Sequence, residues 1–143
     1  MSVMKKIACR AVWPLATALA FGFCCAGCGG GPPMQKAKGQ VLVDGKNYQV
    51  GPREQLLVIF YPDVDQPPTT YPAEVKSDGS YETVGLEGRG IPPGKYRVGL
   101  SSPYGGGSVT IPKELGLSSS PIVREVVLGK DTIEPIDILK PAG

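Results

Sequence analysis

The chain contains no histidine, and all four of its cysteines lie at or before position 28. The absence of histidine excludes Ser-His-Asp triads and Cys-His pairs, and it removes the commonest metal ligand of proteins. Because no cysteine follows Cys28, disulfide bonds cannot hold the later part of the chain together. A metal or redox site at Cys25 and Cys28 would lack the further ligands that a structural zinc ion needs. We therefore expect no catalytic residues, no metal and no cofactor, in a protein that is not an enzyme.

The sequence also has no concentration of charge of one sign over most of its length. It holds 15 basic and 13 acidic residues, and three of the basic ones, Lys5, Lys6 and Arg10, stand in the first ten positions. The rest of the chain then carries 12 basic and 13 acidic residues, which are scattered along it. Nucleic-acid-binding domains present a clustered basic face. We therefore expect no nucleic-acid partner.

An apolar run long enough to span a bilayer is missing as well. Residues 11–23 are almost wholly apolar, but a membrane-spanning helix needs about 20 such residues. A basic start, a short apolar run and the small residues Ala26 and Gly27 are the three parts of a secretory signal peptide. The alternative is an N-terminal membrane anchor that is never cleaved. The early end of the apolar run, at Gly22 and the cysteines after it, favours the signal peptide.

The sequence Cys25-Ala26-Gly27-Cys28 resembles the lipobox of bacterial lipoproteins, in which small residues precede a cysteine that becomes acylated. The resemblance implies that residues 1–27 are a lipoprotein signal peptide and that Cys28, carrying palmitate and other acyl chains, is the new N-terminus. Residues 28–37 are then a tether rich in glycine and proline. Gly29, rather than aspartate, follows the cysteine. This implies an exported protein, lipid-anchored at the outer membrane and facing the periplasm or the cell surface.

No long helix is expected in the rest of the chain, because 15 prolines and 20 glycines interrupt nearly every segment. The continuous apolar run at 56–61 is typical of a central strand that is buried on both faces. Alternation at 95–100 places Tyr96, Val98 and Leu100 on one face. We expect an all-β fold, an antiparallel β-sandwich of about seven strands over residues 38–140. The other expected elements are a strand at 40–43, a hairpin of 73–76 with 81–84, one helical turn at 113–117, and a last pair of 122–128 with 132–139, in which Pro135 marks an edge or bulge.

Two polar stretches, SDGS at 77–80 and IPPGK at 91–95, contain residues that suit either a small site or a tight turn. A calcium loop needs several carboxylates in a fixed series, and Asp78 stands without them. Asp78 and Gly79 instead suit the positive φ angles of a tight hairpin. Pro93 fixes its own φ and Gly94 supplies a left-handed position, which predicts a type II turn. We interpret all four residues as structural.

Turn and core motifs follow one another along residues 38–139: KGQVLVDGK at 38–46, Asp78-Gly79-x-Tyr81, Gly85-Leu86, PGKYRV at 93–98, the segment 120–127 and Gly129-Lys130. In this order they resemble the carboxypeptidase regulatory-like domain, a transthyretin- or prealbumin-like β-sandwich. Such motifs indicate a fold better than a function. The resemblance implies a small secreted bacterial lipoprotein whose domain is a stalk, spacer or binding module. Its partners would be membrane lipid and envelope proteins or glycans.

Three tyrosines support an alternative function. Tyr61, Tyr71 and Tyr104 lie at expected strand ends or in loops, where tyrosines can stack on sugars. A carbohydrate- or cell-wall-binding module is therefore the second hypothesis, although strand-end tyrosines with a hydrated hydroxyl are the plainer interpretation. A Ser-Lys dyad between the serines of 101–108 and Lys113 would make the protein an enzyme, but no spacing supports one.

Overall fold

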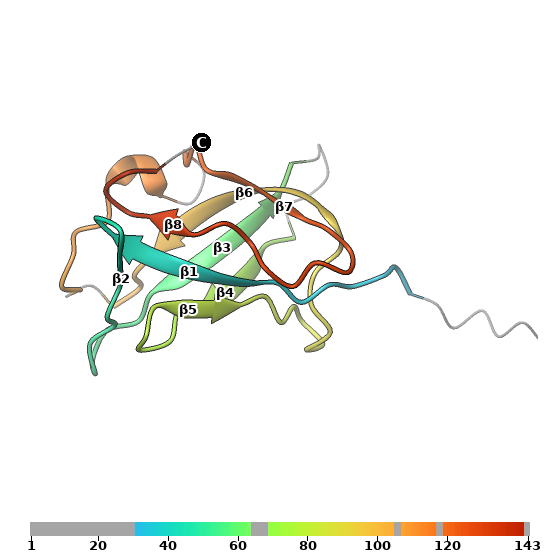
Figure 1. Cartoon of the computed structure of the whole chain (residues 1–143), viewed down its shortest axis with the longest axis horizontal. Coiled ribbons are helices and arrows are strands. Elements are labelled where there is room, and N and C mark those ends of the chain that lie inside the picture. Colours follow the sequence, from blue (N-terminus) through green and yellow to red (C-terminus); the bar gives the residue numbers. More distant parts are fainter. Residues whose placement is uncertain (1–30, 64–68, 105–106, 117–118, 142–143) are drawn as a thin grey trace, which may run out of the picture.

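The computed structural model describes residues 31–63, 69–104, 107–116 and 119–141. The predicted signal peptide, the lipobox residues Cys25, Ala26 and Gly27, and the predicted acylation site Cys28 lie outside the described residues. Within them the protein is all-β, with one short 3-10 turn where a helical turn was predicted, and no helix is long and apolar enough to cross a membrane. The elements are β1 (Lys38–Val43), β2 (Lys46–Asn47), β3 (Leu57–Pro62), β4 (Tyr71–Glu74), β5 (Ser80–Glu82), β6 (Gly94–Ser101), η1 (Lys113–Leu115), β7 (Val123–Val126) and β8 (Ile136–Asp137) (Figure 1).

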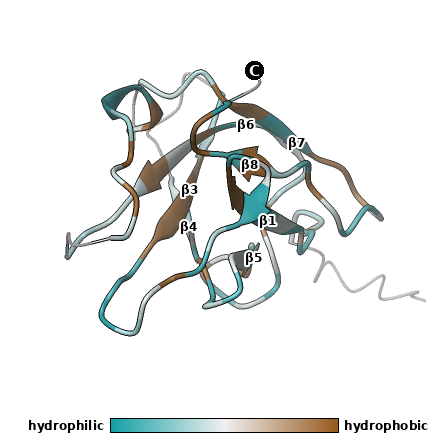
Figure 2. Cartoon of the chain, turned by 60° about the vertical axis from the view of Figure 1, so that its left-hand side comes forward, coloured by the Kyte–Doolittle hydropathy of each residue, from teal (hydrophilic) through white to brown (hydrophobic). Residues whose placement is uncertain are grey.

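The strands form two four-stranded sheets. In the first sheet β1 is central, with β2 and β5 antiparallel to it and β8 parallel to it. The second sheet has the order β4-β3-β6-β7 and is antiparallel throughout. The sheets enclose one apolar core, consistent with a β-sandwich, and Figure 2 shows the hydrophobic residues of β3 in the second sheet. The predicted all-β fold is confirmed at this level.

The strand β3 lies between β4 and β6, in the central position that its apolar run predicts. Its side chains alternate: Val58 and Phe60 are fully buried, whereas Leu57, Ile59 and Tyr61 are partly exposed. The prediction of burial on both faces is therefore wrong. Only the inner face of the second sheet packs against the first sheet, and the outer face is only partly covered.

The strand β6 confirms the predicted alternation. Tyr96, Val98 and Leu100 are buried, Lys95 and Arg97 on the other face are exposed, and Gly99 is buried as well. Because β6 pairs with both β3 and β7, its buried side chains form the middle of the inner face of the second sheet.

The two segments that were predicted as strand pairs within one sheet run from one sheet to the other. β4 and β5 flank the turn at 77–80, but they belong to different sheets, and a single β-bridge between Val75 and Tyr81 joins them. β7 pairs with β6 and β8 pairs with β1, so the last two strands do not pair with each other. The first hairpin forms only beside its turn, where Val75 bridges Tyr81 and the N–H of Lys76 donates to the carbonyl of Ser80 at 2.8 Å. The predicted last pair is wrong, because a turn fixes where the chain reverses while burial of each apolar side decides which sheet a strand joins. Pro135 directly precedes β8, an edge strand of the first sheet.

Three aromatic rings meet in the core. The ring centre of Phe60 lies 6.1 Å from that of Tyr81 and 5.9 Å from that of Tyr96. The Tyr96 hydroxyl donates a hydrogen bond to the carbonyl oxygen of Pro92 at 2.6 Å. The buried Tyr81 hydroxyl has no hydrogen-bond partner among the described residues. Burial raises the pKa of both tyrosines, that of Tyr96 to about 12, so both hydroxyls stay protonated.

Candidate functional site

The chain enters the sandwich through Gln35, which is clamped at one end of it. The backbone of Gln35 exchanges two hydrogen bonds with Ile91, at 2.8 and 3.0 Å. Its side-chain amide donates to the carboxylate of Asp131 at 2.9 Å, and its side-chain oxygen accepts from the backbone N–H of Gly129 at 2.8 Å. Gln35 is only 9% exposed. The packed part of the protein therefore extends before Lys38, where the domain was predicted to begin.

Gly90 provides the space for this clamp. Its φ angle is +101°, and a Cβ atom at this position would overlap the backbone of Gln35. Both the backbone conformation and the close approach therefore require glycine. Two residues after Gln35, Ala37 is fully buried, and its N–H donates to the hydroxyl of Thr83 at 2.9 Å. The loop at 84–90 and the turn at 127–130 thus lie on either side of the point where the chain enters (Figure 1).

The predicted turn residues Asp78 and Gly79 form a tight turn between the two sheets. Gly79 has a φ angle of +80°, and a Cβ atom there would lie 2.5 Å from the carbonyl oxygen of Tyr48. Asp78 does not have a positive φ, contrary to the prediction. Its carboxylate accepts hydrogen bonds from the hydroxyl and the N–H of Ser80, at 2.7 and 3.0 Å, and these bonds hold the pKa of Asp78 below its ordinary value. The carboxylate of Asp78 therefore stabilises the turn through hydrogen bonds within it.

Pro93 and Gly94 lead the chain into β6 without a type II turn. The φ angle of Gly94 is +155°, whereas a type II turn needs about +80° at this position. Gly94 is already the first residue of β6. The prediction of a type II turn is therefore wrong, and the segment is extended because Gly94 pairs with Val126 of β7.

The structure does not bring the three candidate ligand tyrosines together. Tyr61 lies on the outer face of the second sheet, and Tyr71 lies on its inner face, opposite Phe60. The ring of Tyr71 packs edge-on against Tyr96, with ring centres 6.1 Å apart. Tyr104 is 79% exposed and follows the far end of β6. Because the three rings lie in three separate places, they form no common stacking surface for a sugar.

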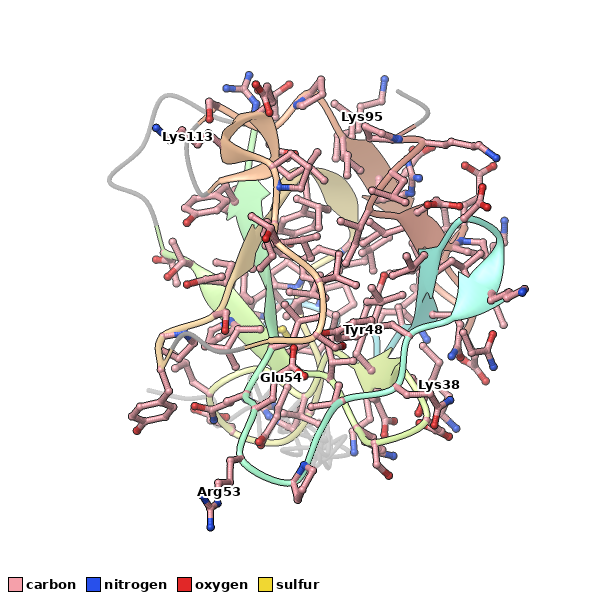
Figure 3. The ribbon with its side chains drawn as sticks, turned by 90° about the vertical axis from the view of Figure 1, so that its left-hand side faces the viewer. Lys38, Tyr48, Arg53, Glu54, Lys95 and Lys113 are labelled. Carbon is pink, nitrogen blue, oxygen red and sulfur yellow. The ribbon has the colours of Figure 1, made fainter. Side chains whose placement is uncertain are left out.

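A polar cluster that the sequence analysis missed joins Tyr48, Glu54 and Ser108 at the end of the sandwich away from Gln35. The Tyr48 hydroxyl donates to the carboxylate of Glu54 (Figure 3). The Ser108 hydroxyl donates to the hydroxyl oxygen of Tyr48 at 3.4 Å. The second carboxylate oxygen of Glu54 accepts from the N–H of Gly51 at 3.1 Å. Burial, and then the bond to Glu54, raise the pKa of Tyr48, so its hydroxyl stays a donor and does not act as a base. No local motif marks the cluster, because Ser108 lies 60 residues from Tyr48.

A hollow of about 570 Å³ lies at one open edge of the sandwich, beside β4 and β5. Its volume falls in the range of roughly 300–1,000 Å³ that is usual for ligand sites. Three carboxylates and one amine line it, together with apolar side chains, which suits a cationic ligand with an apolar part. Within the described residues the carboxylates do not converge as a metal-binding group. The charged lining residues are Glu54, Glu74, Glu82 and Lys76, and the apolar ones are Val50, Pro52, Val75 and Val84.

The opposite edge, between β7 and the chain before β8, has a hollow of about 340 Å³. Arg124 lines this hollow and is only 7% exposed. Its guanidinium donates to the backbone carbonyls of Val123, Glu134 and Pro135, at 2.8, 3.3 and 3.0 Å. These bonds connect β7 of the second sheet to the segment that leads into β8 of the first. Arg124 therefore acts as a cross-link between the sheets.

The serines and the lysine considered as a dyad do not form one. Ser101, Ser102 and Lys113 line a third hollow, of about 420 Å³. The Ser102 hydroxyl is buried without a hydrogen-bond partner in the described part of the chain, and Ser108 is bonded to Tyr48. A serine nucleophile needs its base within about 2.6–3.2 Å. The arrangement therefore supplies no activated serine.

Comparison with known proteins found no matching family model, no similar curated protein and no similar solved structure. The residues and their geometry therefore carry the functional interpretation. The features that they offer are the clamp at one end and the hollows along the two open edges.

Proposed function

We propose that this protein is a non-catalytic lipoprotein of the cell envelope, anchored through acylated Cys28. It displays one β-sandwich of the carboxypeptidase regulatory-like, transthyretin-like type in a structural or binding role. The observation that supports this most directly is the entry of the chain at one end of the sandwich, through the clamped Gln35. The lipobox-like sequence CAGC ends only seven residues before this clamp.

The short connection between Cys28 and Gln35 determines how such a protein would sit at a membrane. Seven residues span at most about 25 Å when fully extended. Acyl chains contribute about 0.8 kcal/mol for each buried methylene, so two or three of them anchor a protein firmly. The connection cannot lengthen without breaking the hydrogen bonds of Gln35. The clamped end of the sandwich therefore faces the lipid.

The hollow beside β4 and β5 is the part of the described surface that is best suited to a binding role. It combines a ligand-sized volume with three carboxylates and an apolar lining. The alternative of a glycan-binding surface made by Tyr61, Tyr71 and Tyr104 lacks the common platform that stacking requires. The geometry therefore favours a cationic segment of an envelope partner over a sugar.

Metabolic labelling with palmitate in a bacterial host tests the anchor. The full chain should take up label, and Cys28→Ser should abolish the labelling and leave an unprocessed, longer polypeptide. Cys24→Ser is the matched control, because it removes a neighbouring thiol outside the four-residue motif and should leave labelling unchanged. Label that persists in Cys28→Ser, or a wild-type chain without label, would contradict the proposal.

Separation of inner and outer membranes on a density gradient tests the location. The labelled protein should sediment with the outer membrane, because Gly29 follows the cysteine in place of aspartate. Recovery of the labelled chain with the inner membrane would refute the assignment to the outer membrane while leaving the lipid anchor intact.

A further inference from the structure

Two leucines are strongly exposed at the clamped end of the sandwich. Leu86 is 83% exposed and Leu128 is 58% exposed. A single exposed leucine is ordinary on a protein surface. These two are notable because each lies in a short loop at the same end of the molecule, where polar residues are the usual choice.

Each loop is closed by a backbone hydrogen bond that leaves its leucine outside. The N–H of Gly90 donates to the carbonyl of Val84 at 2.8 Å, which closes the loop that contains Leu86. The N–H of Lys130 donates to the carbonyl of Val127 at 3.0 Å, which places Leu128 at the tip of a four-residue turn. The fold therefore does not use either leucine in its core.

Both loops are attached to the residue through which the chain enters. The loop with Leu86 continues directly into Ile91, which pairs with the backbone of Gln35. The turn with Leu128 continues into Gly129, whose N–H donates to the side chain of Gln35. The two leucines thus flank the end of the connection that begins at Cys28.

We propose that this end of the sandwich rests on the bilayer surface, with Leu86 and Leu128 inserted at the level of the lipid headgroups. The inference rests on the proposed acylation of Cys28, which brings the leucines to the membrane. A connection of at most about 25 Å keeps both loops within reach of the headgroups. Apolar side chains of interfacial segments reach roughly 5–10 Å into that layer.

The charges around the two leucines are compatible with a lipid surface. The entering chain at 31–37 and the segments 84–90 and 127–131 carry three positive charges, on exposed Lys36, Arg89 and Lys130, against two negative charges, on Glu87 and Asp131. Arg89 and Glu87 form an ion pair with each other, and the carboxylate of Asp131 accepts a hydrogen bond from the side chain of Gln35. The balance does not repel anionic headgroups, and lysines close to the surface attract them.

The sequence offers a clean test, because its one tryptophan lies in the predicted signal peptide at position 13. Leu86→Trp and Leu128→Trp therefore each give an acylated protein with one tryptophan. Leu139→Trp is the matched control: Leu139 is 55% exposed and follows β8 at the far end of the sandwich. The purified acylated proteins are reconstituted into vesicles of phosphatidylethanolamine and phosphatidylglycerol whose acyl chains carry bromine near the carbonyl.

We expect a blue shift and quenching of tryptophan emission for Leu86→Trp and Leu128→Trp, and neither change for Leu139→Trp. Vesicle flotation separates the two hypotheses. Protein that floats without selective quenching at the two loops overturns this inference and leaves the anchor standing, whereas wild-type protein that does not float overturns both. Equal quenching at all three positions also refutes the inference, because the sandwich would then have no fixed orientation. A blue shift seen in native envelope membranes but not in the vesicles would likewise refute it, because a protein partner would then cover this end.

Discussion

Replacing either of two buried tyrosines by phenylalanine removes the same hydroxyl group but should change stability in opposite directions. Tyr81 and Tyr96 are 1% and 3% exposed, and both rings pack against Phe60. The Tyr81 hydroxyl has no hydrogen-bond partner within the described chain. The Tyr96 hydroxyl donates to the carbonyl of Pro92 at 2.6 Å. Comparing Tyr81→Phe with Tyr96→Phe therefore measures how much a hydrogen bond to a buried hydroxyl changes the free energy of unfolding.

The magnitudes follow from what each hydroxyl does in the core. Burying a hydroxyl without a partner costs about 1–3 kcal/mol in protein mutational data, so Tyr81→Phe should raise the free energy of unfolding by about 1 kcal/mol. Tyr96→Phe should lower it by about 1 kcal/mol, since it removes the one hydrogen bond to the half-buried Pro92. For a domain of about 100 residues, each kcal/mol shifts the melting temperature by roughly 4 °C.

Urea unfolding of the two variants beside the wild type measures both signs at once. The unfolding midpoint should rise for Tyr81→Phe and fall for Tyr96→Phe, with the same slope against urea in all three proteins. A loss of stability in Tyr81→Phe as large as that in Tyr96→Phe would refute the reasoning, because it would show that the Tyr81 hydroxyl has a stabilising partner.

Three further perturbations test other contacts. Gly79→Ala should cost more stability than Gly129→Ala, because both residues have φ near +80° but only at Gly79 would the new Cβ meet a backbone oxygen; equal costs in urea unfolding would contradict this. Arg124→Met should lower the free energy of unfolding by about 1–3 kcal/mol, because three carbonyls lose their donor, and an unchanged midpoint would show that the cross-link is dispensable. The contribution of Tyr96 to stability should be constant below pH 10 and fall as the pH rises towards about 12, because an unfolded tyrosine loses its proton at its ordinary pKa of 10.0 whereas Tyr96 keeps it to about 12. Thermal unfolding across this interval, compared with Tyr96→Phe, measures the contribution, and a pH dependence identical in the variant would assign it elsewhere.

A strand was predictable from the sequence where the apolar positions of its local pattern are also the positions that the core buries. Alternation at β6 identified Tyr96, Val98 and Leu100 as core residues, and the structure buries all three. The apolar run at β3 identified a central strand but not its half-exposed outer face, because hydrophobic residues on an uncovered face look the same in sequence. The turn at Asp78 and Gly79 was located correctly, although only the glycine takes the positive φ angle.

The candidate sites were less predictable, because they depend on residues distant in the chain. The bond of Tyr48 to Ser108 crosses 60 positions, and the clamp of Gln35 to Asp131 crosses 96. The tyrosines were grouped by their place near strand ends, and pairing then put Tyr61 and Tyr71 on opposite faces of one sheet.

The sequence by itself determined an all-β chain without histidine and without a cysteine in its described part, because composition, turn residues and short-range periodicity act on neighbouring positions. Only the tertiary structure decided that β5 and β8 join β1 while β4 and β7 join the other sheet. It also decided that the chain enters beside two exposed leucines. The physical reason is that burial of each apolar face is satisfied only when the whole core assembles, and no local segment contains that information.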